Sequence, residues 1–226
     1  MNRFLLLAAV LVLAVPGPTF GEIVYTGSQP VTLQLGSGMT MDSRTIHIAG
    51  QTDQQTGKWD DFRVDLWWDD DIMAMTGMSH LVIYAPMGIT PTGMTYMSMI
   101  VGAFDLSSQQ VPYALKLPAG EPIDEDSSFV PWAILYNTGV GQFGADGGYI
   151  GLMMDIPGGS PHYAWLRMLS QSNLGGNTQS VTFDGSAYEN VPGTAIGAGV
   201  IPAPAAIVLG GLGIGLVTWL RRRRVL

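Results

Sequence analysis

The stretch Phe62-Arg63-Val64-Asp65-Leu66-Trp67-Trp68 has the clearest strand pattern in the chain. Successive side chains of a β-strand point to opposite faces of its sheet. One face would therefore line a core with the apolar side chains of Phe62, Val64, Leu66 and Trp68. Arg63, Asp65 and Trp67 would share the other face, which places an indole ring beside charged neighbours and away from the core.

Short apolar runs recur on both sides of this strand at spacings of about ten residues, separated by Gly, Pro, Asn and Asp. We expect strands at 23–25, 31–35, 45–48, 62–68, 81–84, 94–104, 133–136, 149–154, 163–169 and 181–183. No long helical period interrupts them. The pattern predicts an all-β fold, a two-sheet β-sandwich or jelly roll over residues 22–194.

The composition fits one soluble-type domain flanked by two unusual ends. Hydrophobic residues make up 47% of the 226 residues, enough for one sizeable core. Five basic residues stand against 18 acidic ones between residues 22 and 201, a formal charge of −13. Such a surface repels phosphate backbones, so we expect no nucleic-acid partner. The absence of Cys excludes disulfides, thiolate metal sites and a Cys nucleophile.

The first 21 residues have the layout of a secretory signal peptide. Arg3 precedes an uncharged apolar run at 4–15, Pro16 follows the run, and small residues stand at Thr19 and Gly21. We expect cleavage after Gly21, so that the domain is exported. An uncleaved N-terminal anchor is the alternative.

The C-terminus has three parts. Pro202, Ala203 and Pro204 precede an uncharged run at 205–220, and Arg221, Arg222, Arg223 and Arg224 follow it. The run predicts one transmembrane helix, and the eighteen residues from Ala203 to Leu220 would span about 27 Å. The arginines would stay in the cytoplasm by the positive-inside rule. Gly211 and Gly215 form a small-xxx-small pair for close helix packing. Residues 195–201 would be a flexible Gly/Ala spacer between the domain and the 202–226 tail.

This tail resembles the PEP-CTERM sorting signal of Gram-negative bacteria, in the variant of planctomycete-type species. Pro202 and Pro204 match the two prolines of that family, whereas Ala203 stands where the family usually has Glu. The resemblance implies that a membrane-embedded exosortase recognises and removes the tail. The protein would then be anchored in the inner membrane, with its domain outside the cytoplasm, and would reach the cell surface or medium once processed. With Ala203, a permanent membrane anchor is the alternative.

A looser resemblance to the same group of proteins covers residues 147–201. It rests on Tyr149-Ile150-Gly151-Leu152, on His162-Tyr163-Ala164-Trp165 and on the run 187–199, Ala-Tyr-Glu-Asn-Val-Pro-Gly-Thr-Ala-Ile-Gly-Ala-Gly. It implies a secreted β-sandwich and no particular activity.

No motif in the sequence points to catalysis. The chain has no Gly-x-Ser-x-Gly elbow, no His-Glu-x-x-His pair and no phosphate-binding Gly-Lys loop, and His47, His80 and His162 lie far apart. We therefore expect a protein that is not an enzyme.

Three groups of residues are candidates for ligand binding. Trp67 with Asp65 and Asp69 would suit a sugar, unless a neighbouring segment covers the ring. Asp69, Asp70 and Asp71 would suit Ca²⁺, as would Asp124-Glu125-Asp126, and a solvated turn is the alternative for both groups. The Met-x-Met pairs 39/41, 73/75 and 97/99 would offer thioethers to Cu(I), with His47 or His80 as a further ligand. Core filling is the alternative for the methionines.

Three functions follow from these observations. The first is a structural or adhesive envelope protein associated with exopolysaccharide, as the family resemblance implies. The second is a carbohydrate-binding module that uses Trp67, with or without a calcium ion. The third is a copper-binding protein that uses the methionines.

Overall fold

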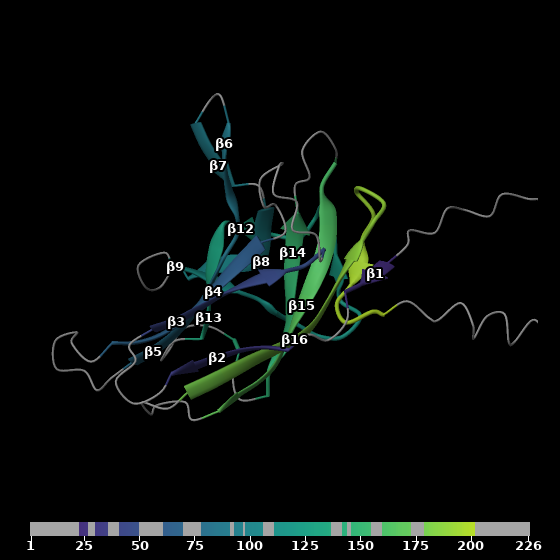
Figure 1. The fold of residues 1–226 in the computed structure, drawn as a ribbon. Helices are drawn as coiled ribbons and strands as arrows, with labels where there is room; N and C mark the ends of the chain where they lie inside the picture. The colour runs from purple at the N-terminus through teal and green to yellow at the C-terminus, as the bar shows by residue number, and fades with distance from the viewer. Residues whose placement is uncertain are drawn as a thin grey trace, which may run out of the picture.

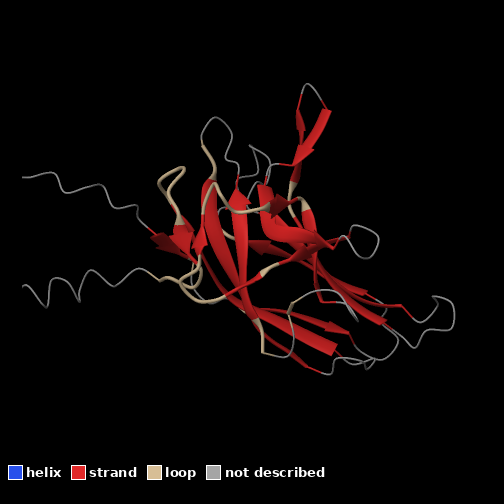
Figure 2. Cartoon of the chain, turned by 180° about the vertical axis from the view of Figure 1, so that it is seen from behind, coloured by secondary structure: helices blue, strands red, loops and turns tan. Residues whose placement is uncertain are grey.

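The computed structural model describes residues 23–26, 30–35, 41–49, 61–69, 78–90, 93–96, 98–105, 111–136, 142–143, 146–154, 160–172 and 179–201. Every regular element in these residues is a β-strand, as Figure 2 shows, so the predicted all-β class is confirmed. The strands are β1 (Ile23–Tyr25), β2 (Val31–Leu35), β3 (Met41–His47), β4 (Asp61–Asp69), β5 (Met78–Tyr84), β6 (Met87–Thr90), β7 (Gly93–Tyr96), β8 (Ser98–Asp105), β9 (Val111–Ala114), β10 (Lys116–Leu117), β11 (Pro122–Ile123), β12 (Phe129–Val130), β13 (Trp132–Tyr136), β14 (Gly148–Met154), β15 (His162–Ser172), β16 (Gln179–Glu189) and β17 (Ile196–Gly197).

Thirteen of these strands form one continuous, curled sheet. Its main path runs β1-β16-β15-β14-β8-β9-β13-β5-β4-β3, with β2 on β16, β10 on β14 and β12 on β8. Neighbours are antiparallel except for β13 and β9, which are parallel. Strand β8 turns the corner, because its first residues pair with β14 and its later residues pair with β9. Figure 1 shows the β14–β16 half of the sheet crossing the β3–β5 half, with the β6–β7 hairpin projecting from one end.

The two ends of the curled sheet meet at β2 and β3. The backbone N–H of Gln34 on β2 donates to Oδ2 of Asp42 on β3 at 2.9 Å. Asp42 also forms an ion pair with Arg44 at 3.4 Å. The buried Asp42 carboxylate therefore links a strand of one half to the edge strand of the other.

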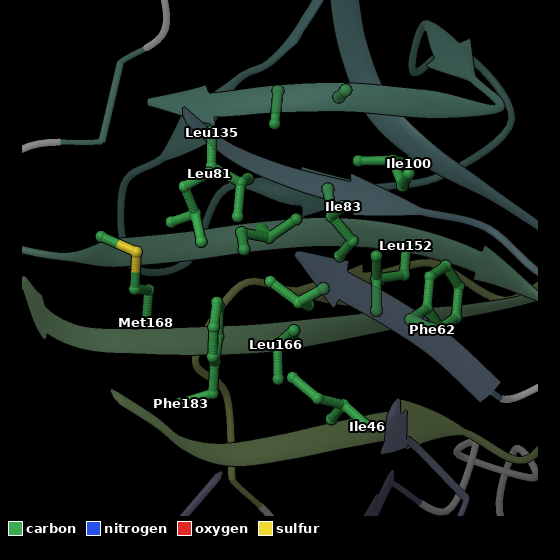
Figure 3. Close-up of a cluster of buried hydrophobic side chains, with 14 of the residues drawn as sticks. Ile46, Phe62, Leu81, Ile83, Ile100, Leu135, Leu152, Leu166, Met168 and Phe183 are labelled. Carbon is green, nitrogen blue, oxygen red and sulfur yellow. The ribbon is translucent and has the colours of Figure 1, made fainter. Parts of the chain in front are cut away.

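The main core fills the space between the two halves. Alternate residues of β4 and β5 point into it from one side and meet residues of β14, β15 and β16 from the other. Figure 3 labels Ile46, Phe62, Leu81, Ile83, Ile100, Leu135, Leu152, Leu166, Met168 and Phe183, all buried. Burial of each Leu, Ile or Phe of this kind contributes about 1.5–3 kcal/mol, so this cluster dominates the stability of the fold.

A second core lies on the opposite face of β14 and β15. Its buried members are Val101, Leu117, Ile123, Tyr163, Trp165, Ala187, Ile196 and Ala198. The last two come from residues 195–201, which we call the C-terminal strap. Strand β17 of the strap pairs with β11. The next residue, Ala198, donates its backbone N–H to the carbonyl oxygen of Glu121, and its own carbonyl oxygen accepts from the N–H of Gly120, each at 2.8 Å.

The strap corrects the predicted flexible spacer. Its Gly and Ala content suggested flexibility, but small residues also allow a backbone to lie close to aromatic rings. Gly199 has φ +73°, and a Cβ there would lie 2.5 Å from the Tyr149 ring. Gly199 is therefore required for this packing, and the packed part of the strap extends to Val200, whose N–H donates to the Gly197 carbonyl oxygen and whose carbonyl oxygen accepts from Trp165.

One expected strand also differs. The apolar run 94–104 contains two strands, β7 and β8, because its first part pairs with β6 and its later part with β14 and β9. The predicted signal peptide (1–21) and tail (202–226) lie outside the described residues. Within the described residues, no helix long and apolar enough for a membrane crossing occurs.

Candidate functional site

Strand β4 divides its side chains between the main core and the outer face of the sheet. Phe62, Val64 and Leu66 are fully buried in the main core. Arg63 and Trp67 lie on the outer face, as the alternation in the sequence predicted, and both are exposed. The register with β3 and β5 arranges the residues of this outer face in rows that run across the strands.

Trp67 is the centre of the first row. Its side chain is 40% exposed, and its ring lies 5.2 Å from the His80 ring on β5, tilted by 51°. Met41 on β3 is its partner on the other side and is also exposed. We call this set the Trp67 row; it consists of Met41, Trp67 and His80. The described segments of the chain therefore leave much of this indole open to solvent.

Asp65 belongs to a second row, in which most of the side chains are buried. It is 4% exposed and accepts hydrogen bonds from Ser43 Oγ at 2.6 Å and from Arg63 Nε at 2.8 Å, with a further bond from Arg63 Nη2. The hydrogen bond to Asp65 raises the pKa of the Arg63 guanidinium. Asp65 therefore holds Arg63 in place, and its oxygens are already engaged by protein groups.

A third row was not foreseen from the sequence. The Arg63 guanidinium lies 5.3 Å from the centre of the Tyr84 ring on β5, and Tyr84 stacks on Trp132 of β13 at 6.4 Å and 23°. Thr45 on β3 completes what is called the Tyr84 row below. Burial raises the pKa of Tyr84, and Asp65 raises it further while Arg63 lowers it. Only the pairing of β13 with β5 brings Trp132 to this face, so local sequence could not reveal it.

The histidines occupy separate places. The His47 ring on β3 pairs with the Asp61 carboxylate on β4, at the end of the outer face. His80 lies beside Trp67. His162 is buried on β15, where its Nδ1 lies 2.7 Å from the carbonyl oxygen of Glu189. The described chain does not gather the three rings into one site.

The acidic candidates are only partly described. Asp69 is the last residue of β4, whereas Asp70 and Asp71 lie outside the described residues. In the second group, Asp124 Oδ1 accepts from the Asp126 backbone N–H at 3.1 Å and from Ser127 Oγ at 3.3 Å, which closes a local turn. No set of three or more metal-binding side chains occurs among the residues that are described.

Only two of the six methionines in the Met-x-Met pairs are among the described residues. Met39, Met73, Met75 and Met97 lie outside the described residues, and Met41 and Met99 lie on β3 and β8. The pair 73/75 thus lies wholly outside the described residues, and Met41 and Met99, the described members of the other two pairs, do not define a thioether site by themselves. The same limit holds for Pro202, Ala203, Pro204, Gly211, Gly215 and Arg221 to Arg224.

Comparisons with known proteins found no similarity on which to base a function. No protein-family model matches the chain, and neither a curated protein nor a solved structure resembles it significantly. The outer face of β4 and β5 is therefore the candidate site on its own geometry.

Proposed function

We propose that this chain is a non-enzymatic envelope protein whose exported domain binds extracellular polysaccharide through the outer face of β3, β4, β5 and β13. The observation that carries the proposal is the indole of Trp67, 40% exposed on strand β4, which is paired with β3 on one side and β5 on the other. Met41, its neighbour on β3, is 44% exposed, so the two side chains form adjoining exposed apolar surface. Contiguous apolar surface that is open to solvent favours a binding role.

A sugar ring suits this surface chemically. The face of an indole ring is electron-rich, and the C–H groups on one side of a pyranose ring are weakly positive, so the two stack. Thr45 is exposed on the same face and offers a hydroxyl group to a sugar, and the partly exposed His80 ring lies beside Trp67. A ligand with both apolar faces and hydroxyl edges fits this mixture better than a purely apolar one.

The two ends of the sequence support the cellular setting of this proposal. The signal-peptide pattern at 1–21 and the tail with Pro202, Ala203, Pro204 and four arginines fit an exported protein held at the inner membrane. A PEP-CTERM-type tail would then pass the domain to an exosortase-type enzyme. In this proposal the curled sheet acts as a two-layered β-sandwich that displays its outer face to the extracellular polymer.

Affinity electrophoresis of the full chain in mild detergent tests the proposal. The gels would contain hydroxyethyl cellulose, galactomannan or alginate. We expect at least one neutral polymer to retard the wild-type protein, and Trp67→Ala to reduce the retardation strongly. The matched control is Phe104→Ala, because Phe104 is 53% exposed on β8, away from the three rows. Unchanged mobility of the wild type in every gel would refute the proposal.

A further inference from the structure

The outer face carries two rows of exposed or partly exposed side chains, and a row of mostly buried side chains lies between them. The Trp67 row is Met41, Trp67 and His80, and the Tyr84 row is Thr45, Arg63, Tyr84 and Trp132. We infer that both rows bind one ligand, and that this ligand is an uncharged, extended polysaccharide chain. The inference rests on the proposed function and adds the class of glycan and a second subsite.

The spacing of the rows sets the length of the ligand. Trp67 and Arg63 are four residues apart on β4, and His80 and Tyr84 are four residues apart on β5. At about 3.4 Å per residue, the two rows lie about 14 Å apart along the strands. A single sugar ring is much shorter than this distance, so only a chain of several sugars, lying along the strands, contacts both rows.

Because the row between them is mostly buried, we expect the contacts with the ligand to concentrate on the Trp67 row and the Tyr84 row. Its side chains are Asp65, Val82 and Ile134, all buried, and the partly buried Ser43. Asp65 is engaged by Ser43 and Arg63, and the two aliphatic residues offer no hydrogen bonds. A ligand that crosses this row would therefore gain most of its binding free energy from the aromatic and polar groups on either side.

The Tyr84 row is already organised for binding. The Arg63 guanidinium is fixed over Tyr84 by its hydrogen bonds to Asp65, and Tyr84 is fixed against Trp132. These contacts lower the conformational entropy that the side chains lose when a ligand binds, which favours affinity. Trp132, the last ring of the stack, is partly exposed.

The charges on this face argue for an uncharged glycan. Within the three rows the formally charged side chains are Arg63 and Asp65, and they neutralise each other in an ion pair. The remainder of the domain is strongly acidic, with 18 acidic residues in the whole sequence. An anionic polysaccharide would be repelled by that field, and the rows supply no unpaired cation to offset the repulsion.

Isothermal titration of the full chain in detergent with β-1,4-linked gluco-oligosaccharides of two to six units tests the inference, with the manno-oligosaccharide series used if galactomannan is the retained polymer. We expect the affinity to rise with length until the ligand contacts both rows. We expect Trp132→Leu to weaken binding of the hexamer about tenfold, as for loss of one aromatic contact, and to leave the dimer unchanged. Trp67→Ala should weaken both.

The outcomes separate the two proposals. If the wild type binds but Trp132→Leu changes neither ligand, or changes both equally, the second subsite is wrong while glycan binding stands. If the wild type binds no oligosaccharide or polymer, both proposals fail. Trp132→Leu keeps an apolar side chain at the site, and its melting temperature checks folding; Tyr84→Leu provides a second variant of the same row.

The salt dependence tests the charge of the ligand. We expect the affinity for the neutral polymer to change less than twofold between low and high NaCl concentration, because no net charge is neutralised. Tighter binding of alginate than of the neutral polymers, or an affinity that depends steeply on salt, would overturn the assignment to an uncharged glycan.

Discussion

The indole Nε1 of Trp165 donates a hydrogen bond to the carbonyl oxygen of Val200, with 3.1 Å between the two atoms. The same ring lies 6.1 Å from the Tyr25 ring of the first strand and 5.5 Å from the Tyr149 ring. One buried tryptophan thus joins the first strand of the domain to its C-terminal strap. Figure 1 shows β1 and the last described residues on the same side of the molecule.

Replacing Trp165 with Phe should destabilise the domain. The substitution leaves the Val200 carbonyl without its donor and removes ring volume from the second core, so we expect a loss of about 2–4 kcal/mol. Urea unfolding, followed by near-ultraviolet circular dichroism, measures it. Trp67→Phe is the control on an exposed ring and should change stability by less than about 0.5 kcal/mol. Equal effects of the two variants would contradict the role assigned to Trp165.

The boundary of the domain should lie at the end of the strap. A chain that ends at Ile201 keeps β17, Ala198 and the Val200 carbonyl, and we expect it to melt at the temperature of the full-length domain. A chain that ends at Thr194 exposes Ile123 and Trp165, which the strap helps to bury. It should melt at least about 5 °C lower, since a loss of 1 kcal/mol shifts a domain of this size by about 2–4 °C. Identical melting curves would instead support a spacer.

Two glycines allow the packing of the strap to be tested separately from its backbone conformation. Gly199 and Gly193 have similar positive φ angles, +73° and +71°, but a Cβ at Gly193 would meet nothing within 4 Å. Gly193→Ala should therefore cost only the backbone strain, about 1 kcal/mol, whereas Gly199→Ala adds a clash with Tyr149 and should cost about 2–4 kcal/mol. Chemical unfolding of both variants measures the difference. If the two costs are the same, the close contact with Tyr149 is not important.

Stability should fall at alkaline pH. Burial raises the pKa of Tyr84 and of Tyr163 above the ordinary value of 10.0, and nearby carboxylates, Asp65 and Glu125 respectively, raise each further. The folded state therefore holds these protons more tightly than the unfolded state does. This contribution is fully present below about pH 10 and is lost as the pH rises through the folded-state pKa values.

Thermal melting across this range checks the prediction. We expect a constant melting temperature up to about pH 9 and a decline above about pH 10. The double variant Tyr84→Phe, Tyr163→Phe should show a shallower decline, because neither ring then ionises. A wild-type curve that is flat to higher pH would contradict the raised pKa values.

The candidate site was only partly predictable from the sequence. The alternation in 62–68 placed Arg63, Asp65 and Trp67 on one face, because the period of a strand is a local property. It did not reveal that Asp65 is buried or that Ser43 of the neighbouring strand donates a hydrogen bond to it, since the pairing of β3 with β4 is not a local property. It also could not reveal Trp132, which reaches Tyr84 only through pairing between distant parts of the chain.

The all-β class and the positions of most of the longer strands were predictable from the residue pattern, because apolar runs, alternation and turn residues act over a few neighbouring residues. Tertiary structure alone decided the order of the strands, the curl of the sheet at β8, and the packing of the strap. Residues 195–201 illustrate the reason. Their Gly and Ala content is compatible with a flexible spacer or a tightly packed segment, and only the rings of Tyr149 and Trp165, supplied by β14 and β15, decide between them.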